Sequence, residues 1–153
     1  MIAAIVMLAN MVAQPLPVGP KPDAFPAPAD PAALSVVVAQ TVDQTDPKPI
    51  CPQPYCTSLF RATFTNARTI VGPAVPEKFA ARMEMGSPFN MTYTMAMLVE
   101  HLPDGSWIVR TSRGFDFQTH EACLDLVEGK AIGWTVSTPG VTRRGDEICF
   151  KEK

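Results

Sequence analysis

The distribution of proline limits this chain more than any other sequence feature. The 153-residue chain contains 16 prolines, about twice the usual share of roughly 5%. Most of them lie between Pro15 and Pro54. Proline fixes φ and lacks a backbone N–H, so this density excludes helix interiors and central strands. We interpret residues 14–50 as a disordered Pro-rich linker that is polyproline II where prolines alternate.

One stretch interrupts this linker. Residues 31–40 read Pro-Ala-Ala-Leu-Ser-Val-Val-Val-Ala-Gln and have the apolar content of a short helix or strand. Residues 14–50 contain no Trp or Tyr and only one Phe, which leaves little apolar surface to offset the entropy of ordering. This composition favours an apolar patch within a tether.

The first thirteen residues resemble an export signal. Ile2 to Ala9 is a continuous apolar run, long enough for a signal-peptide core and too short to span a bilayer. No Lys or Arg precedes it, and Met11 occupies the third position before the expected cleavage after Ala13. An uncleaved anchor and a buried segment are the alternatives. We expect a periplasmic or secreted protein with residues 1–13 as a candidate signal peptide and no spanning membrane segment.

The cysteines agree with export. Their number is even, and all of them follow the linker, which ends at residue 50: Cys51, Cys56, Cys123 and Cys149. In an exported chain this predicts two disulfides. The simplest pairing joins Cys51 to Cys56 and Cys123 to Cys149, and long-range pairing of the first two with the last two is the alternative. A zinc site is the rival, although Cys123 and Cys149 form no second close pair. Free thiols are the third possibility.

Residues 51–153 have the pattern of a β-domain. Apolar and polar residues alternate with period two, and this predicts strands over 57–71, 78–85, 91–102, 107–115, 131–137 and 146–151. Asp104-Gly105 is a strong hairpin signal, so sequential strands are expected to form a meander. Thr119 to Gly129 has the cap residues and apolar spacing of a short helix. Residues 139–145 are expected to form the loop before the last strand.

These elements predict a mainly β domain. Five to six short twisted strands in about 100 residues tend to close on themselves, because closure removes exposed edges. We therefore expect a small antiparallel barrel or strongly curled sheet with one short helix. The oligonucleotide/oligosaccharide-binding (OB) barrel is the nearest architecture by analogy.

Charge argues against nucleic acid as the partner. From Cys51 onward the chain has eleven basic and eleven acidic residues, so this domain lacks the excess positive charge of nucleic-acid binders. A local binding face is still possible where basic and aromatic residues of different strands meet: Arg61, Arg110, Arg113, Trp107 and Phe115. The alternative is that these arginines are solvated charges on the outer face.

No catalytic constellation stands out. His120 and Cys123 could form an imidazole–thiol pair, but Cys123 is better explained as half of a disulfide. Phosphate-binding, nucleophile-elbow and zinc-hydrolase motifs are missing, so we predict no cofactor and no metal. The sequence favours an exported, disulfide-stabilised, non-enzymatic binding module for a protein or envelope ligand. A small Cys/His-dependent enzyme and a barrel for oligosaccharide or single-stranded nucleic acid are the alternatives.

Overall fold

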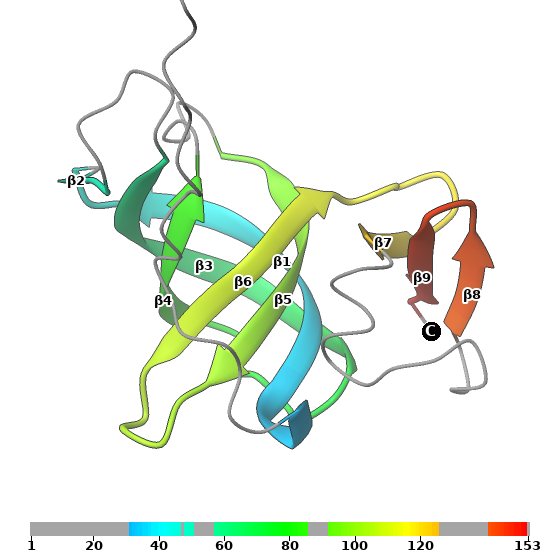
Figure 1. Ribbon diagram of the computed structural model, residues 1–153, viewed down its shortest axis with the longest axis horizontal. Helices are drawn as coiled ribbons and strands as arrows, with labels where there is room; N and C mark the ends of the chain where they lie inside the picture. The colour runs from blue at the N-terminus through cyan, green and yellow to red at the C-terminus, as the bar shows by residue number, and fades with distance from the viewer. Residues whose placement is uncertain (1–30, 47, 51–56, 86–91, 126–140, 153) are drawn as a thin grey trace, which may run out of the picture.

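The computed structural model describes residues 31–46, 48–50, 57–85, 92–125 and 141–152, which form two β-sheets (Figure 1). The larger sheet contains β1 (Leu34–Gln44), β2 (Lys48–Pro49), β3 (Ser58–Val71), β4 (Phe79–Met85), β5 (Thr94–His101) and β6 (Trp107–Gly114). The smaller one contains β7 (Glu121–Asp125), β8 (Val141–Arg144) and β9 (Glu147–Lys151), and a short 3-10 turn at Pro31–Ala33 precedes β1. Within these ranges no helix is long and apolar enough to cross a membrane.

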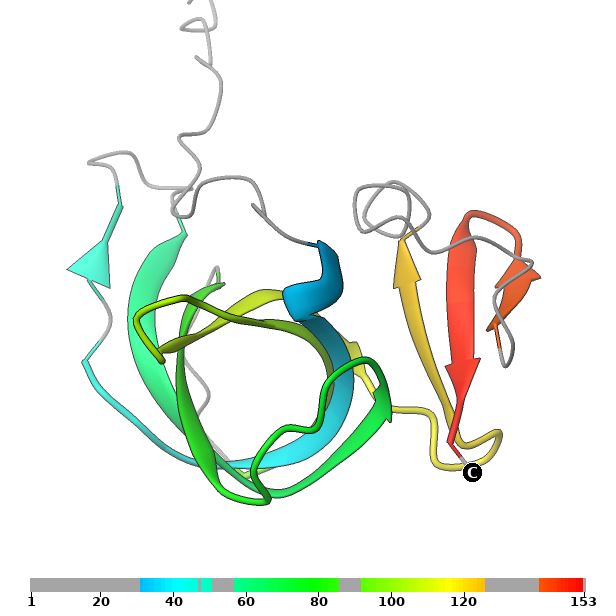
Figure 2. The ribbon, with the colours of Figure 1, turned by 90° about the horizontal axis from the view of Figure 1, so that it is seen from below.

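Five strands of the larger sheet close into a barrel, which Figure 2 shows end-on. The order is β1-β5-β6-β4-β3, and β3 pairs again with β1. This order and the strand directions are those of an OB barrel, so the predicted fold class is confirmed. The expected uninterrupted meander is wrong, because β4 pairs with β6 in parallel. An odd number of strands cannot close with every pair antiparallel, so one parallel pair is required.

β1 is the main correction to the predicted domain organisation. Its first six residues are buried, and it pairs with β5 from Leu34 to Gln40 and with β3 from Val36 to Gln44. The tether interpretation is therefore wrong for residues 34–44, and the barrel begins before residue 51. Prolines flank this strand without interrupting it, and consecutive valines provide the apolar surface that aromatic residues provide elsewhere. Residues 1–30, with the candidate signal peptide, lie outside the described ranges.

Two hydrophobic cores meet at β1. Val37 and Ala39 point into the barrel with Phe60, Phe64, Met83, Met95 and Met97. Val36 and Val38 point outward with Ala96 and Leu98 of β5, against Ala122, Leu124, Val141, Ile148 and Phe150 of the smaller sheet. The smaller sheet thus covers the outer face of β1 and β5 (Figure 1). This second layer accounts for the burial of β5 on both faces, which its two-sided apolar sequence predicts.

Strands β7, β8 and β9 of the C-terminal region form a three-stranded sheet in the order β7-β9-β8. A helix was expected from Thr119 to Gly129, but Glu121–Asp125 is strand β7 and pairs with β9. Ala122 and Leu124 point into the core on alternate positions of the strand. This period-two pattern is only a few residues long, so the helix-cap residues dominated the prediction. The expected loop over 139–145 is wrong from Val141 to Arg144, which forms β8. The predicted strand over 131–137 lies outside the described residues.

A valine pair on β1 tests whether this strand belongs to the barrel. Val37 is fully buried, whereas Val42 on the same strand is 46% exposed. Val37→Ala removes buried apolar groups and leaves a cavity, so we expect it to lower the free energy of unfolding by about 2 kcal/mol. Val42→Ala should change it by less than about 0.5 kcal/mol. Urea unfolding measures both, and equal effects would contradict the placement of β1.

Candidate functional site

A groove of about 570 Å³ lies on the outer face of β3 and β4. The alternation that turns Phe60 and Phe79 inward turns Arg61 and Arg82 outward along its floor. Residues of the segment after β1 and of the β5–β6 turn form its sides. Its described lining consists of Thr45, Asp46, Lys48, Leu59, Phe60, Arg61, Pro76, Lys78, Phe79, Ala80, Arg82, Gly105, Ser106 and Trp107.

The groove is cationic although the chain from Cys51 onward carries no net charge. Four of its described lining residues are basic, and Asp46 is the one acidic residue among them. Arg61 and Arg82 are directly opposite each other in the β3–β4 register. Like charges at opposed positions destabilise a sheet. Because both arginines lie on the same outer face of the sheet, one anion in the groove could contact both of them.

Hydrogen bonds hold both sides of the groove in place. On one side, Thr45 N–H donates to the Arg61 carbonyl at 2.9 Å, and Arg61 N–H donates to Thr45 Oγ1 at 3.0 Å. On the other, Asp104 Oδ1 accepts from the Ser106 amide at 2.9 Å and from its hydroxyl at 2.6 Å. These Ser106 bonds, with a smaller contribution from the Arg82 charge, lower the pKa of Asp104. Gly105 between them has a φ of 81°, which glycine adopts without strain.

Trp107 provides the aromatic surface of the groove. Its ring stacks on His101 at 4.4 Å between centroids and meets Phe79 edge-on at 5.8 Å. Phe60 and Phe79 are only 4% and 6% exposed, whereas Trp107 is half-buried. A ligand in the groove would therefore find one accessible aromatic ring among the described lining residues.

The structure brings together only two of the five residues that were predicted to form one binding face. Arg61 and Trp107 lie together in the groove. Arg110 Nε instead donates to the buried Glu100 carboxylate at 2.7 Å. Phe115 is buried in the core beneath the smaller sheet, and Arg113 lines a separate cavity beside Glu121 and Cys123.

Sequence reasoning missed Lys48, Lys78 and Arg82 as groove residues. The alternation over 78–85 already places Lys78 and Arg82 on the face opposite the core, so their outward direction was available. Their proximity to Arg61 was not, since it depends on the register of β3 against β4. Lys48 was assigned to the linker, whereas it pairs with Leu59 of β3.

The Cys123–His120 alternative is not supported. Cys123 forms a disulfide with Cys149, which confirms that half of the simplest predicted pairing; Cys51 and Cys56 lie outside the described residues. His120 Nδ1 lies 3.5 Å from Glu152 Oε2, and the same carboxylate accepts from Arg68 Nε of β3. Burial would raise the pKa of Glu152, but Arg68 and His120 more than offset this, and the pKa falls below its usual value.

The basic side chains of the groove are suited to contacting an anion. Its described lining contains neither histidine nor cysteine, so no imidazole or thiol among these residues could act as a base or nucleophile. Lysine and arginine bind carboxylates, sulfates and phosphates. Comparisons with protein-family models, with curated proteins and with solved structures each found no match.

The lowered pKa of Glu152 predicts that the stability of the protein depends on pH. A carboxyl whose folded pKa is depressed stabilises the protein above its unfolded pKa, near 4.5, and loses this contribution as the pH falls through the folded value. Glu152→Gln should therefore be less stable than wild type at pH 7, by less than about 1 kcal/mol. Urea unfolding from pH 7 to pH 3 should show this difference shrink as Glu152 takes up a proton; a constant difference would contradict the assignment.

Removal of the Cys123–Cys149 disulfide should lower the stability of the protein more than Glu152→Gln does. Cys123 and Cys149 are 26 residues apart in the chain, and closing a loop of this size contributes about 3 kcal/mol through the unfolded state. Cys123→Ser and Cys149→Ser each break the cross-link. Both should lower the melting midpoint by roughly 10 °C, measured by circular dichroism. Midpoints like that of the wild type would show that this bond adds no stability.

Proposed function

We propose that this protein is a non-enzymatic binding module that holds an extended acidic glycan in the β3–β4 groove. The observation that carries the proposal is the direct opposition of Arg61 and Arg82 on the groove floor. Lys48 and Lys78 add positive charge to the groove lining. Together these four basic side chains offer several contacts to one extended polyanion.

The aromatic content favours a glycan over a single-stranded nucleic acid. Proteins that bind single strands without sequence preference stack successive bases on several aromatic rings. Here Trp107 is the accessible ring among the described lining residues, and Phe60 and Phe79 are buried. One ring can pack against one sugar, while the arginines and lysines bind the carboxylates or sulfates of neighbouring units.

The proposal places this activity outside the cytoplasm, in the periplasm or in the secreted fraction. The Cys123–Cys149 disulfide supports it, since such bonds persist in oxidising compartments. The apolar run at residues 2–9 supports it as an export signal. Acidic polysaccharides are abundant at the cell surface, so the compartment and the charge of the groove point to the same ligand class.

Calorimetric titration with oligogalacturonate tests the ligand class. We expect binding that weakens with added salt, because the contacts are ionic. Arg61→Gln and Arg82→Gln should each weaken it by about tenfold or more, since a hydrogen bond to a charged group contributes about 1.5–3 kcal/mol. Arg143→Gln is the matched control, because Arg143 is an exposed arginine of β8, outside the groove.

Two results would contradict the proposal. Equal affinity for a neutral oligosaccharide of the same length would show that the cations do not select the ligand. Tighter binding of oligothymidylate than of oligogalacturonate, lost in Arg61→Gln, would assign the groove to single-stranded nucleic acid instead.

A further inference from the structure

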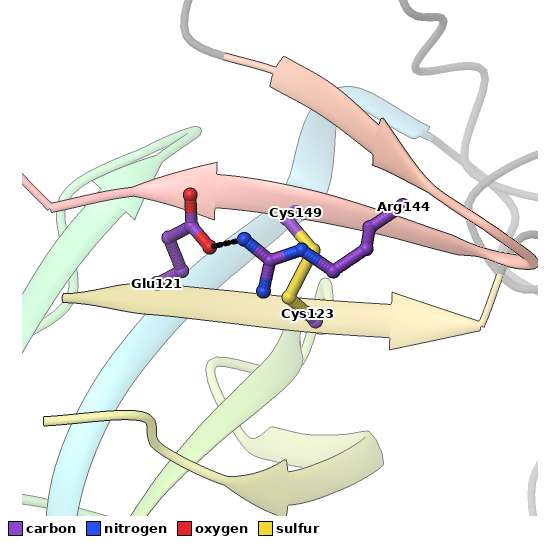
Figure 3. The surroundings of a disulfide bond; sticks show 4 residues. All are labelled: Glu121, Cys123, Arg144 and Cys149. Carbon is purple, nitrogen blue, oxygen red and sulfur yellow. Dashed lines mark hydrogen bonds and ion pairs between the residues drawn. A yellow bond between two sulfur atoms is a disulfide. The ribbon is translucent and has the colours of Figure 1, made fainter. Parts of the chain in front are cut away.

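Three potential metal ligands converge on the outer face of the smaller sheet. Glu121 and Cys123 alternate on one face of β7, and Cys149 is opposite Cys123 on β9. A carboxylate oxygen of Glu121 and the two sulfur atoms all lie within 4.8 Å of one another. Figure 3 shows the Glu121 carboxylate and the disulfide on this face, with the Arg144 side chain extended across them.

This cluster adjoins a cavity of about 280 Å³. Glu121, Cys123 and Arg144 line it, together with Arg113, Gly114, Asp116 and Glu147. Cys123 is partly exposed, whereas Cys149 is only 1% exposed. An incoming reductant therefore reaches the sulfur of Cys123 first, and a cation can enter by the same route.

We propose that reduction of this disulfide creates a binding site for a soft divalent cation such as zinc. A dithiol reductant attacks Cys123 Sγ, the Cys123–Cys149 bond breaks, and Cys149 leaves as a thiolate. The second thiol of the reductant then displaces Cys123, which leaves the reductant as a disulfide and the protein with two thiols. The cation binds as these thiols lose their protons, with Glu121 as the third ligand and water completing a tetrahedron.

The geometry of the sheet fits this ligand set. Cys123 and Cys149 are directly opposite each other in the β7–β9 register, with their Cα atoms 4.0 Å apart. Two thiolates on one tetrahedral zinc ion, with Zn–S about 2.3 Å, lie about 3.8 Å apart, a separation that two side chains on opposed residues can reach once the disulfide is broken. Glu121 Oε2 accepts a hydrogen bond from Arg144, and a carboxylate oxygen of Glu121 lies within 4.8 Å of both sulfur atoms. Two thiolates and a carboxylate carry one negative charge more than zinc neutralises, and the Arg144 guanidinium offsets it. Arg144 is thus an outer partner that orients the ligating carboxylate.

The site is independent of the proposed function, because the groove lies on β3 and β4 and contains none of these residues. Cobalt(II) titration of the full chain tests it, with Cys51 and Cys56 changed to Ser so that they cannot bind metal. After reduction with a phosphine under argon, one equivalent of cobalt(II) should produce thiolate-to-cobalt absorbance, which zinc then displaces. The oxidised protein should produce none.

Matched variants identify the carboxylate. Glu121→Gln should weaken cobalt(II) binding by about tenfold or more. Glu147→Gln removes the same charge from the same cavity and should leave the affinity within about twofold. Equal affinities of the two variants would overturn the assignment of Glu121 as a ligand.

A second measurement, of the melting midpoint, tests the proposal even if reduction unfolds the smaller sheet. One equivalent of zinc should raise the melting midpoint of the reduced protein and leave that of the oxidised protein unchanged, because binding to the folded state alone stabilises it. A reduced protein that shows neither cobalt absorbance nor a zinc-dependent midpoint would overturn the proposal, whether or not the sheet remains folded.

Discussion

Burial of β1 on both of its faces is the constraint on which the rest of the structure depends. Hydrogen bonds to β3 on one side and β5 on the other close the barrel. Val37 and Ala39 fill its interior, while Val36 and Val38 form the surface on which the smaller sheet packs. Gly72, after β3, adjoins the start of β1: a Cβ there would lie 2.3 Å from the Leu34 carbonyl oxygen. Both cores and both candidate sites therefore depend on one short valine-rich segment.

Closure of the barrel also determines where the groove forms. With five strands, one neighbouring pair has to be parallel, and this pair is β4–β6. The pairing of Ala81 with Trp107 brings the β5–β6 turn beside β4, where Trp107 and Ser106 line the groove. The register of β3 with β4 places Arg61 opposite Arg82. The cationic character of the groove is thus a consequence of topology and register acting on residues far apart in the chain.

Local pattern was sufficient for the strands that have one buried and one exposed face. Phe60, Ala62 and Phe64 alternate with polar residues, and the expected strand over 57–71 agrees closely with Ser58–Val71. The same pattern failed for β1, because burial on both faces removes the alternation and the surrounding prolines then dominate the interpretation. It also failed for β7, because the helix-cap residues around this segment outweighed the short alternation of Ala122 and Leu124 in the prediction. Groove residues from different strands could be assigned a face, but their proximity needed the register.

The central claim is that Leu34–Gln44 is an integral strand of the barrel, and hydrogen–deuterium exchange tests it most directly. Amides of β1 bonded to β3 and β5 should exchange only through global unfolding, at the rate of the amides of β5. Exchange of residues 34–44 within seconds at neutral pH, while β5 stays protected, would show a tether beside a differently closed sheet and would contradict this account.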